Sequence, residues 1–228
     1  TDRLHHLAEA NLDHSRSIAE LLLARFNPDG HLDDETFRTR AASIQATIDN
    51  SVDLEDARTV LGTMLKAVAA SLRTNVHLES RFGFALRLDP AFLATPERSE
   101  LPYGVFFVHG RGFNGFHVRF RDIARGGLRA VRTRSEDQHA REAERLYDEA
   151  YNLAFAQQLK NKDIPEGGAK AAILLDPYAS LAVDRCVKGF VNCLLDLITP
   201  EPTTRSRVID LFGREELLYL GPDENITP

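Results

Sequence analysis

The spacing of apolar residues changes once along this chain, and the change restricts the possible folds more than any other feature. Up to about residue 76, apolar residues recur every three or four positions, which is the period of an amphipathic helix. Beyond residue 81, helical segments alternate with short runs of β-branched and aromatic residues bounded by Asp, Pro and Gly, which are typical of strands. Helices followed by strands that alternate with long helices predict an α/β fold with a mixed sheet.

The predicted elements divide the chain into two segments. Helices are expected at 4–26, 34–48, 54–76, 135–160 and 181–198. Strands are expected at 81–88, 103–110, 115–120, 171–176 and 217–220. The run at 171–176 is apolar up to its final Asp, so we expect this strand to be buried on both faces. We therefore predict a helical N-terminal segment, 1–78, and an α/β domain, 79–228, whose mixed β-sheet is flanked by helices.

The composition is that of a chain that buries a core and does not cross a membrane. Of its 228 residues 43% are hydrophobic, and the longest apolar run, at 187–198, is interrupted by glycine and polar residues. The N-terminus has neither an initiator Met nor an apolar signal core, so we expect a chain that begins inside a longer, cytoplasmic protein. Cys186 and Cys193 share one face of a predicted helix, too far apart for a disulfide, and are expected to be reduced core thiols.

Gly110, Gly112 and Gly115 have the G-x-G-x-x-G spacing of a dinucleotide-binding turn. Such a turn leads from a strand into a helix, because the helix N-terminus holds the pyrophosphate. Here the residues after the glycines alternate between apolar and polar, which is the period of a strand. We therefore predict a β-hairpin at this position and no cofactor-binding residue in this chain.

Two other glycine pairs lie next to cationic residues, and the second pair precedes the buried strand. Glycine allows the backbone to approach a small ligand closely. We therefore expect both pairs to border a binding site. The two segments are Arg125-Gly126-Gly127 and Gly167-Gly168-x-Lys170.

A helix between these pairs contributes two more candidates. Gln157 and Lys160 are three residues apart and thus neighbours on one helix face. Together with Arg125 and Lys170 they would form a cationic site in an otherwise acidic protein, which suits a small dicarboxylate. Among other cations and partly desolvated, Lys170 is expected to have a pKa near neutral and to act as a general acid or base.

These segments resemble the amino-acid dehydrogenases related to glutamate dehydrogenase. GFHVRFRDIARGGLR, at 115–129, and AQQLKNKDIPEGGAKAAILLDP, at 156–177, are similar to the substrate-binding domain of that family, most of all to the large-subunit NAD-specific glutamate dehydrogenases. The resemblance extends over about 82–228. It implies that NAD is bound mainly by a separate Rossmann domain that follows this segment and is absent from this chain.

The resemblance also implies roles in substrate binding. The family's K-G-G segment, whose lysine holds the side-chain carboxylate of glutamate, matches Arg125, Gly126 and Gly127. Its Q-x-x-K helix, which binds the α-carboxylate, matches Gln157 and Lys160. Because the interval from Lys160 to Lys170 is two residues shorter than in the small enzymes, Lys162 is an alternative ligand of the α-carboxylate.

Two catalytic residues follow from the same resemblance. The lysine that activates water against the iminium carbon matches Lys170, and the aspartate that transfers protons to and from the substrate nitrogen matches Asp223, with Glu224 as its alternative. Arg125 replaces a lysine, which keeps the charge and favours a bidentate grip on a carboxylate. Glu166 stands where the small enzymes have an apolar residue, and the sequence offers no role for it.

The function implied is that of an NAD-dependent glutamate dehydrogenase, which converts L-glutamate to 2-oxoglutarate and ammonia in amino-acid catabolism and is expected to be a homo-oligomer. This chain alone is expected to be inactive, because it has no place for NAD. One alternative is a related leucine, phenylalanine or valine dehydrogenase. Another is an RNA- or nucleotide-binding module, since six arginines lie between Arg119 and Arg134, although the net charge of −6 argues against nucleic-acid binding. No spacing of His, Cys and carboxylates suggests a metal site, and no membrane partner is expected.

Overall fold

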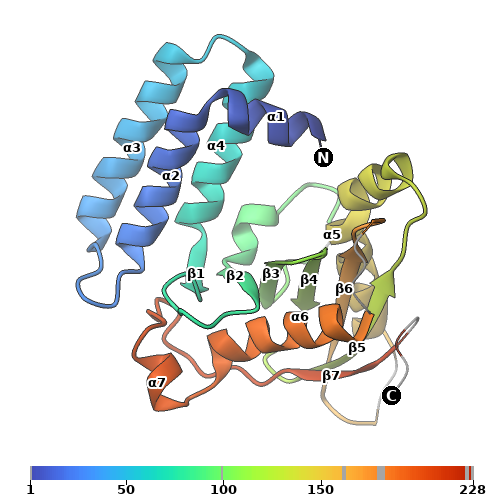
Figure 1. Ribbon diagram of the computed structural model, residues 1–228. Coiled ribbons are helices and arrows are strands. Elements are labelled where there is room, and N and C mark those ends of the chain that lie inside the picture. Colours follow the sequence, from blue (N-terminus) through green and yellow to red (C-terminus); the bar gives the residue numbers. More distant parts are fainter. Residues whose placement is uncertain (1, 99, 161–162, 179–182, 224–225, 227–228) are drawn as a thin grey trace.

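Four helices at the N-terminus pack beside one edge of a sheet (Figure 1). The computed structural model describes residues 2–98, 100–160, 163–178, 183–223 and 226. The helices share a core with Leu86 and Leu88 of the sheet, so the two parts of the chain are packed together. The helices are α1 (Asp2–Ala10), α2 (Leu12–Arg25), α3 (Asp34–Ser51) and α4 (Glu55–Ala69).

One predicted helix is divided in two, and another ends earlier than expected. The helix predicted at 4–26 is two helices, separated at Asn11, whose side-chain amide donates a hydrogen bond of 2.8 Å to the carbonyl of Leu7 and so competes with helical bonding. The helix predicted at 54–76 stops at Ala69, and Ser71–Thr74 forms strand β1 instead. The helical spacing of the apolar residues near 72–76 was therefore misleading.

Seven strands form one sheet in the order β1-β2-β3-β4-β6-β5-β7. The neighbours are antiparallel except for β5, which is parallel to both β6 and β7, so the predicted mixed sheet is confirmed. The strand β5 was not among the predicted elements. The strands after β1 are β2 (Gly83–Leu88), β3 (Gly104–Gly110), β4 (Phe113–Arg119), β5 (Ala124–Val131), β6 (Gly167–Leu175) and β7 (Tyr219–Pro222), with a short 3-10 helix, η1 (Pro90–Leu93), after β2.

One long helix covers each face of the sheet, as Figure 1 shows. On one face α6 (Val183–Ile198) packs against alternate residues of β3, β4 and β6. On the other face α5 (Glu136–Gln158) packs against β4 and β6. Strand β6 is thus buried on both faces, as predicted, and a short helix, α7 (Pro202–Arg205), follows α6.

The G-x-G-x-x-G stretch is a β-hairpin, which confirms the prediction. Strands β3 and β4 are antiparallel and in register from the pair Gly104 and Arg119 to the pair Gly110 and Phe113. Gly112 in the turn has a φ of 81°, a conformation that favours glycine. No helix follows this turn, so it lacks the helix N-terminus that would hold a pyrophosphate.

The two cysteines on α6 are free and buried, as expected. Burial raises the pKa of the Cys193 thiol to about 12 and also raises that of Cys186. Both thiols are therefore protonated and unreactive at neutral pH.

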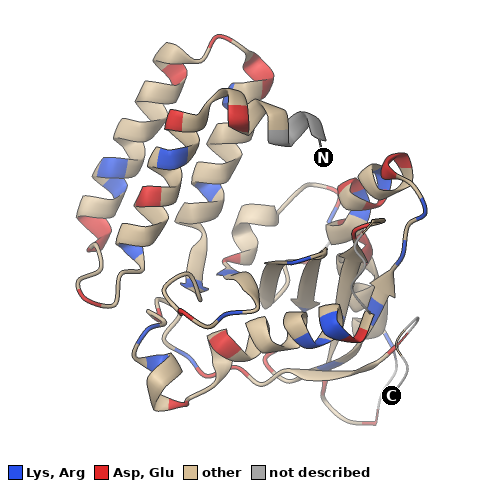
Figure 2. Cartoon of the chain, viewed as in Figure 1, with Lys and Arg blue, Asp and Glu red and all other residues tan. Residues whose placement is uncertain are grey.

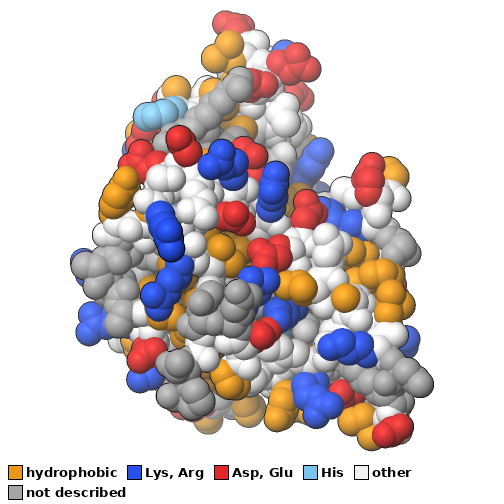
Figure 3. All heavy atoms as spheres, turned by 90° about the vertical axis from the view of Figure 1, so that its right-hand side faces the viewer, with side chains coloured by type: hydrophobic (Ala, Val, Ile, Leu, Met, Phe, Trp, Pro, Cys, Tyr) orange, Lys and Arg blue, Asp and Glu red, His pale blue; other side chains and the backbone are white. Residues whose placement is uncertain are grey.

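Charged side chains of both signs are spread over the outside of the molecule. Figure 2 shows Lys and Arg alternating with Asp and Glu on the outer faces of the N-terminal helices. Figure 3 shows both signs interspersed on the face at the right of Figure 1. Among the described residues, no helix is long and apolar enough to cross a membrane.

Candidate active site

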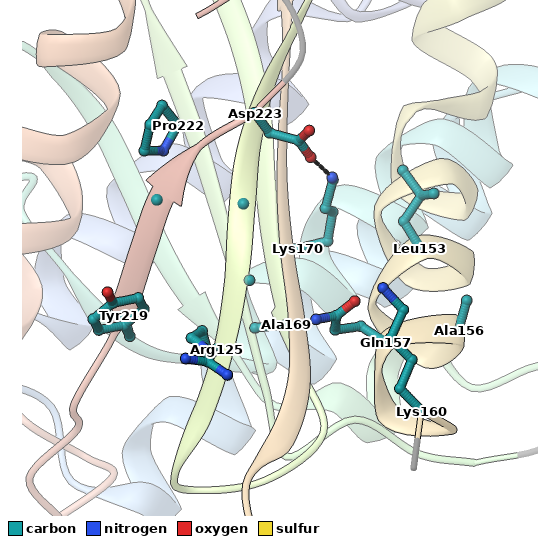
Figure 4. A pocket seen from close by; sticks show the side chains of 13 residues that line it. Arg125, Leu153, Ala156, Gln157, Lys160, Ala169, Lys170, Tyr219, Pro222 and Asp223 are labelled. Atoms are coloured by element: carbon teal, nitrogen blue, oxygen red, sulfur yellow. Dashed lines mark hydrogen bonds and ion pairs between the residues drawn. The ribbon is translucent and has the colours of Figure 1, made fainter. Parts of the chain in front are cut away.

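A pocket of about 480 Å³ lies between the end of α5 and strands β5, β6 and β7 (Figure 4). It contains the side chains of three cations, one amide and one carboxylate. The lining residues are Arg125, Gly126, Gly127, Leu153, Ala156, Gln157, Lys160, Ala169, Lys170, Tyr219, Gly221, Pro222 and Asp223. The structure therefore brings together seven of the nine residues that the sequence proposes for the site.

Lys170 and Asp223 form an ion pair in this pocket. Lys170 points to the α5 face of the sheet because alternate residues of β6 face α6, and its side chain is 14% exposed. Asp223 follows β7, and its carboxylate accepts a hydrogen bond from the Lys170 ammonium. The sequence did not indicate that these two residues would be paired. Glu224, the alternative to Asp223, lies outside the described residues.

Gly127 makes the ion pair possible. It lies on β5, beside Lys170 on one neighbouring strand and Gly221 on the other. A Cβ on Gly127 would lie 2.8 Å from Cβ and 2.9 Å from Oδ2 of Asp223. Because Gly127 has no side chain, the Asp223 side chain can occupy this space and reach Lys170.

The end of α5 supplies the amide and a further cation. Gln157 lies in the last turn of α5, and Lys160 lies two residues beyond the helix end at Gln158; both line the pocket. Figure 4 shows them on the side of the pocket opposite Arg125. Gln158, whose role the sequence did not indicate, accepts a hydrogen bond of 2.8 Å from the N–H of Gly168 and ties the helix to β6. Lys162, the alternative to Lys160, is not among the described residues.

The glycine pair before Lys170 packs against protein and does not line the pocket. A Cβ on Gly167 would lie 2.4 Å from Cγ of Arg121, and one on Gly168 would lie 2.2 Å from the Ala154 carbonyl oxygen. Gly168 therefore permits the close approach of α5 to β6, whereas the sequence suggested an approach to the ligand.

Arg125 extends into the pocket and forms an ion pair with Glu166. The distance from Nη2 of Arg125 to Oε1 of Glu166 is 2.8 Å, and the Glu166 side chain is only 10% exposed. The structure thus gives Glu166 a partner that the sequence did not predict.

A buried cluster of three arginines fixes the segment that leads into β7. Arg73, Arg87 and Arg119 all form ion pairs with the carboxylate of Glu216, whose side chain is fully buried. Arg73 also bonds Asp210, with 2.7 Å between Nε and Oδ1. Burial lowers the pKa of Arg87, and Glu216 opposes this effect. Because Glu216 lies seven residues before Asp223, the cluster restrains the course of the chain toward the pocket.

Ion pairs between several arginines and carboxylates argue against the alternative that the chain binds nucleic acid. Arg119 is buried in the cluster around Glu216, and Arg125 pairs with Glu166. Arg129 pairs with Glu149, with 2.6 Å between Nη1 and Oε1. Half of the six arginines that suggested a basic surface are therefore neutralised by carboxylates.

An α/β domain with a lysine and an aspartate paired in a basic pocket is the arrangement expected of the catalytic domain of an amino-acid dehydrogenase. Residues 43–206 match the family model described as bacterial NAD-glutamate dehydrogenase, catalytic domain. The chain belongs to this family.

Similar proteins from other organisms support the same assignment. The chain is 41% identical over 183 residues to Glutamate dehydrogenase 2 of Dictyostelium discoideum, covering 80% of this chain and 17% of that protein. It is 39% identical over 186 residues to the NAD-specific glutamate dehydrogenase of Neurospora crassa, covering 81% and 18%. The enzyme of the same name from Saccharomyces cerevisiae is 43% identical over 157 residues, covering 67% and 14%. The chain thus spans less than a fifth of the length of these relatives.

Proposed function

We propose that the pocket binds L-glutamate and 2-oxoglutarate. We also propose that the longer protein containing this chain uses NAD to deaminate L-glutamate oxidatively to 2-oxoglutarate and ammonia. The observation that carries the proposal is the Lys170–Asp223 pair inside a pocket that also contains Arg125, Lys160 and Gln157. The similarity to glutamate dehydrogenases of other organisms supports it.

Two groups of side chains would bind the two carboxylates of the substrate. Arg125, on β5, would hold the side-chain carboxylate, since a guanidinium can donate two parallel hydrogen bonds to it. Gln157 and Lys160, at the end of α5, would hold the α-carboxylate through an amide N–H and a cation. Binding at both ends would place the α-carbon beside Lys170.

Lys170 and Asp223 would move the protons. Asp223 would accept a proton from the substrate ammonium and later return one to the departing nitrogen. In its neutral amine form, Lys170 would accept a proton from the water that attacks the substrate carbon. Their contact provides a direct path for a proton between the two residues.

The oxidant that the deamination requires would be NAD. The G-x-G-x-x-G turn of this chain does not fit its pyrophosphate, because strand β4 follows the turn where a helix would be needed. We therefore assign no step to a cofactor on the described residues. A separate NAD-binding domain, a cytoplasmic location and a homo-oligomer stay predictions, as does the inactivity of this chain alone.

A substrate panel on the full-length protein tests this function. We expect NAD reduction with L-glutamate and much slower reduction with L-leucine, L-phenylalanine and L-valine, since Arg125 has no carboxylate to bind in those substrates. A preference for an apolar amino acid would favour the related dehydrogenases. Absence of any amino-acid-dependent NAD reduction would reject the proposal.

A further inference from the structure

Glu166 lies behind Arg125 and not in the pocket itself. The two side chains are joined by the 2.8 Å ion pair, but they differ in burial: Arg125 is 52% exposed and Glu166 only 10%. Arg125 lines the pocket, whereas Glu166 does not. The carboxylate is therefore the fixed partner, and the guanidinium extends from it toward the ligand space.

The backbone holds Glu166 in this position. Its N–H donates a hydrogen bond of 2.9 Å to the Ile164 carbonyl, and the next N–H, that of Gly167, donates one of 2.8 Å to the Ile123 carbonyl. Strands β5 and β6 are parallel from this point, with Arg125 opposite Gly168. Arg125 thus lies on β5, and Glu166 lies immediately before the adjacent, hydrogen-bonded strand β6.

We infer that Glu166 is a positioning residue that aims Arg125 at the side-chain carboxylate of the substrate, an inference that rests on the proposed function. A guanidinium has five N–H donors in one plane and can engage two carboxylates at once. Nη2 of Arg125 lies 2.8 Å from Oε1 of Glu166, and the Arg125 side chain also lines the pocket. An arginine held at one edge loses less conformational entropy when a substrate binds the other.

A lysine at position 125 would behave differently in the same surroundings. Its ammonium is a point charge without a planar fork, so it gains no orientation from a carboxylate behind it. With Glu166 present, the lysine would be drawn away from the substrate. With an apolar residue at 166, it would be free to reach the substrate carboxylate. The effect of a substitution at position 125 on substrate binding is therefore expected to depend on the residue at position 166.

The test compares kcat and KM of the full-length enzyme for L-glutamate and for L-norvaline, whose side chain lacks the carboxylate. For Glu166→Leu we expect KM for glutamate to rise about 10-fold, kcat to change less than about 3-fold, and kcat/KM for norvaline to stay the same. For Glu166→Gln, which keeps a hydrogen-bond acceptor, we expect a rise in KM of about 3-fold. The control is Glu149→Leu, which breaks the ion pair with Arg129 on the same strand but outside the pocket.

A double-mutant cycle makes the test specific. Arg125→Lys alone should raise KM for glutamate. Adding Glu166→Leu should lower KM again, part of the way to the wild-type value, so that the effects of the two substitutions are not additive. A lower KM in Glu166→Leu would mean that Glu166 competes with the substrate and would overturn the inference. Equal losses for glutamate and norvaline, or additive effects, would overturn it as well. If the wild-type enzyme does not oxidise glutamate at all, the proposed function fails first.

Discussion

Lys170 and Asp223 pair across an intervening strand, over the bare backbone of Gly127. Lys170 belongs to β6 and Asp223 follows β7, while β5 lies between them. The pair therefore depends on the absence of a side chain at Gly127. It also depends on the buried ion pairs that fix the chain before β7.

Gly127→Ala tests whether the contact between Lys170 and Asp223 requires a glycine at this position. Its Cβ would lie 2.8 Å from Cβ of Asp223, so the carboxylate must move away from Lys170. A displacement of about 1 Å at a reacting group can lower the rate about 100-fold, which is the loss we expect in kcat. Gly62→Ala on α4 is the control, because its nearest neighbour would be 3.7 Å away. Wild-type turnover in Gly127→Ala would show that the contact is dispensable.

Removing Glu216 should be among the most destabilising changes in this chain. Three guanidinium groups would lose the one buried carboxylate that they share. Leaving buried charges unpaired costs about 3–5 kcal/mol, which we expect for Glu216→Leu. The ion pair of Arg98 with Asp148 is more exposed, so Asp148→Ala should cost less than about 1 kcal/mol. Denaturant unfolding of both variants measures the difference, and similar losses would disprove the special role of the buried cluster.

His117 should make the protein less stable in acid. It is 1% exposed on β4, and neither ring nitrogen has a hydrogen-bond partner among the described residues. Burial, aided by Arg119 and Arg87, lowers its pKa from 6.5 to about 3. Below pH 6.5 the unfolded chain therefore binds a proton that the folded chain does not, and stability falls as the pH drops from 6.5 toward 3.

The slope from this group is about 1.4 kcal/mol per pH unit at most. His117→Phe, which keeps a ring beside Phe106, should remove this part of the pH dependence. His31→Phe is the control at an exposed position. Unfolding curves between pH 7 and pH 4 give the slopes; equal slopes in wild type and His117→Phe would refute the assignment.

The local pattern of apolar and polar residues was sufficient to predict an element where that element's own residues determine its structure. The alternation after Gly115 identified the hairpin, and the apolar run at 171–176 identified the buried strand. It failed for β1, because this strand is held by ion pairs of Arg73 with Asp210 and Glu216, which are distant in sequence. No local signal reports such contacts.

The candidate site likewise contains features that the local sequence predicted and features that depend on tertiary structure. The order of glycine pairs, cations and amide located most of the pocket, since these residues lie on two adjacent strands and the helix between them. Strand β5 was missed because its two glycines weaken the strand signal. Gly126 is needed there because a Cβ would lie 1.8 Å from the Ala169 carbonyl oxygen. The pairing of Glu166 with Arg125 depends on how the loop before β6 folds, which residue types alone do not specify.

The most direct test of the whole account is the turnover of L-glutamate with NAD by the full-length enzyme carrying Lys170→Met. We expect kcat to fall about 1,000-fold, because methionine is an unbranched side chain only one atom shorter than lysine but cannot take up or donate a proton. Lys188→Met, at an exposed position of α6 on the other face of the sheet, should keep wild-type activity. If Lys170→Met turns over glutamate within a few-fold of the wild-type rate, this pocket is not the catalytic site.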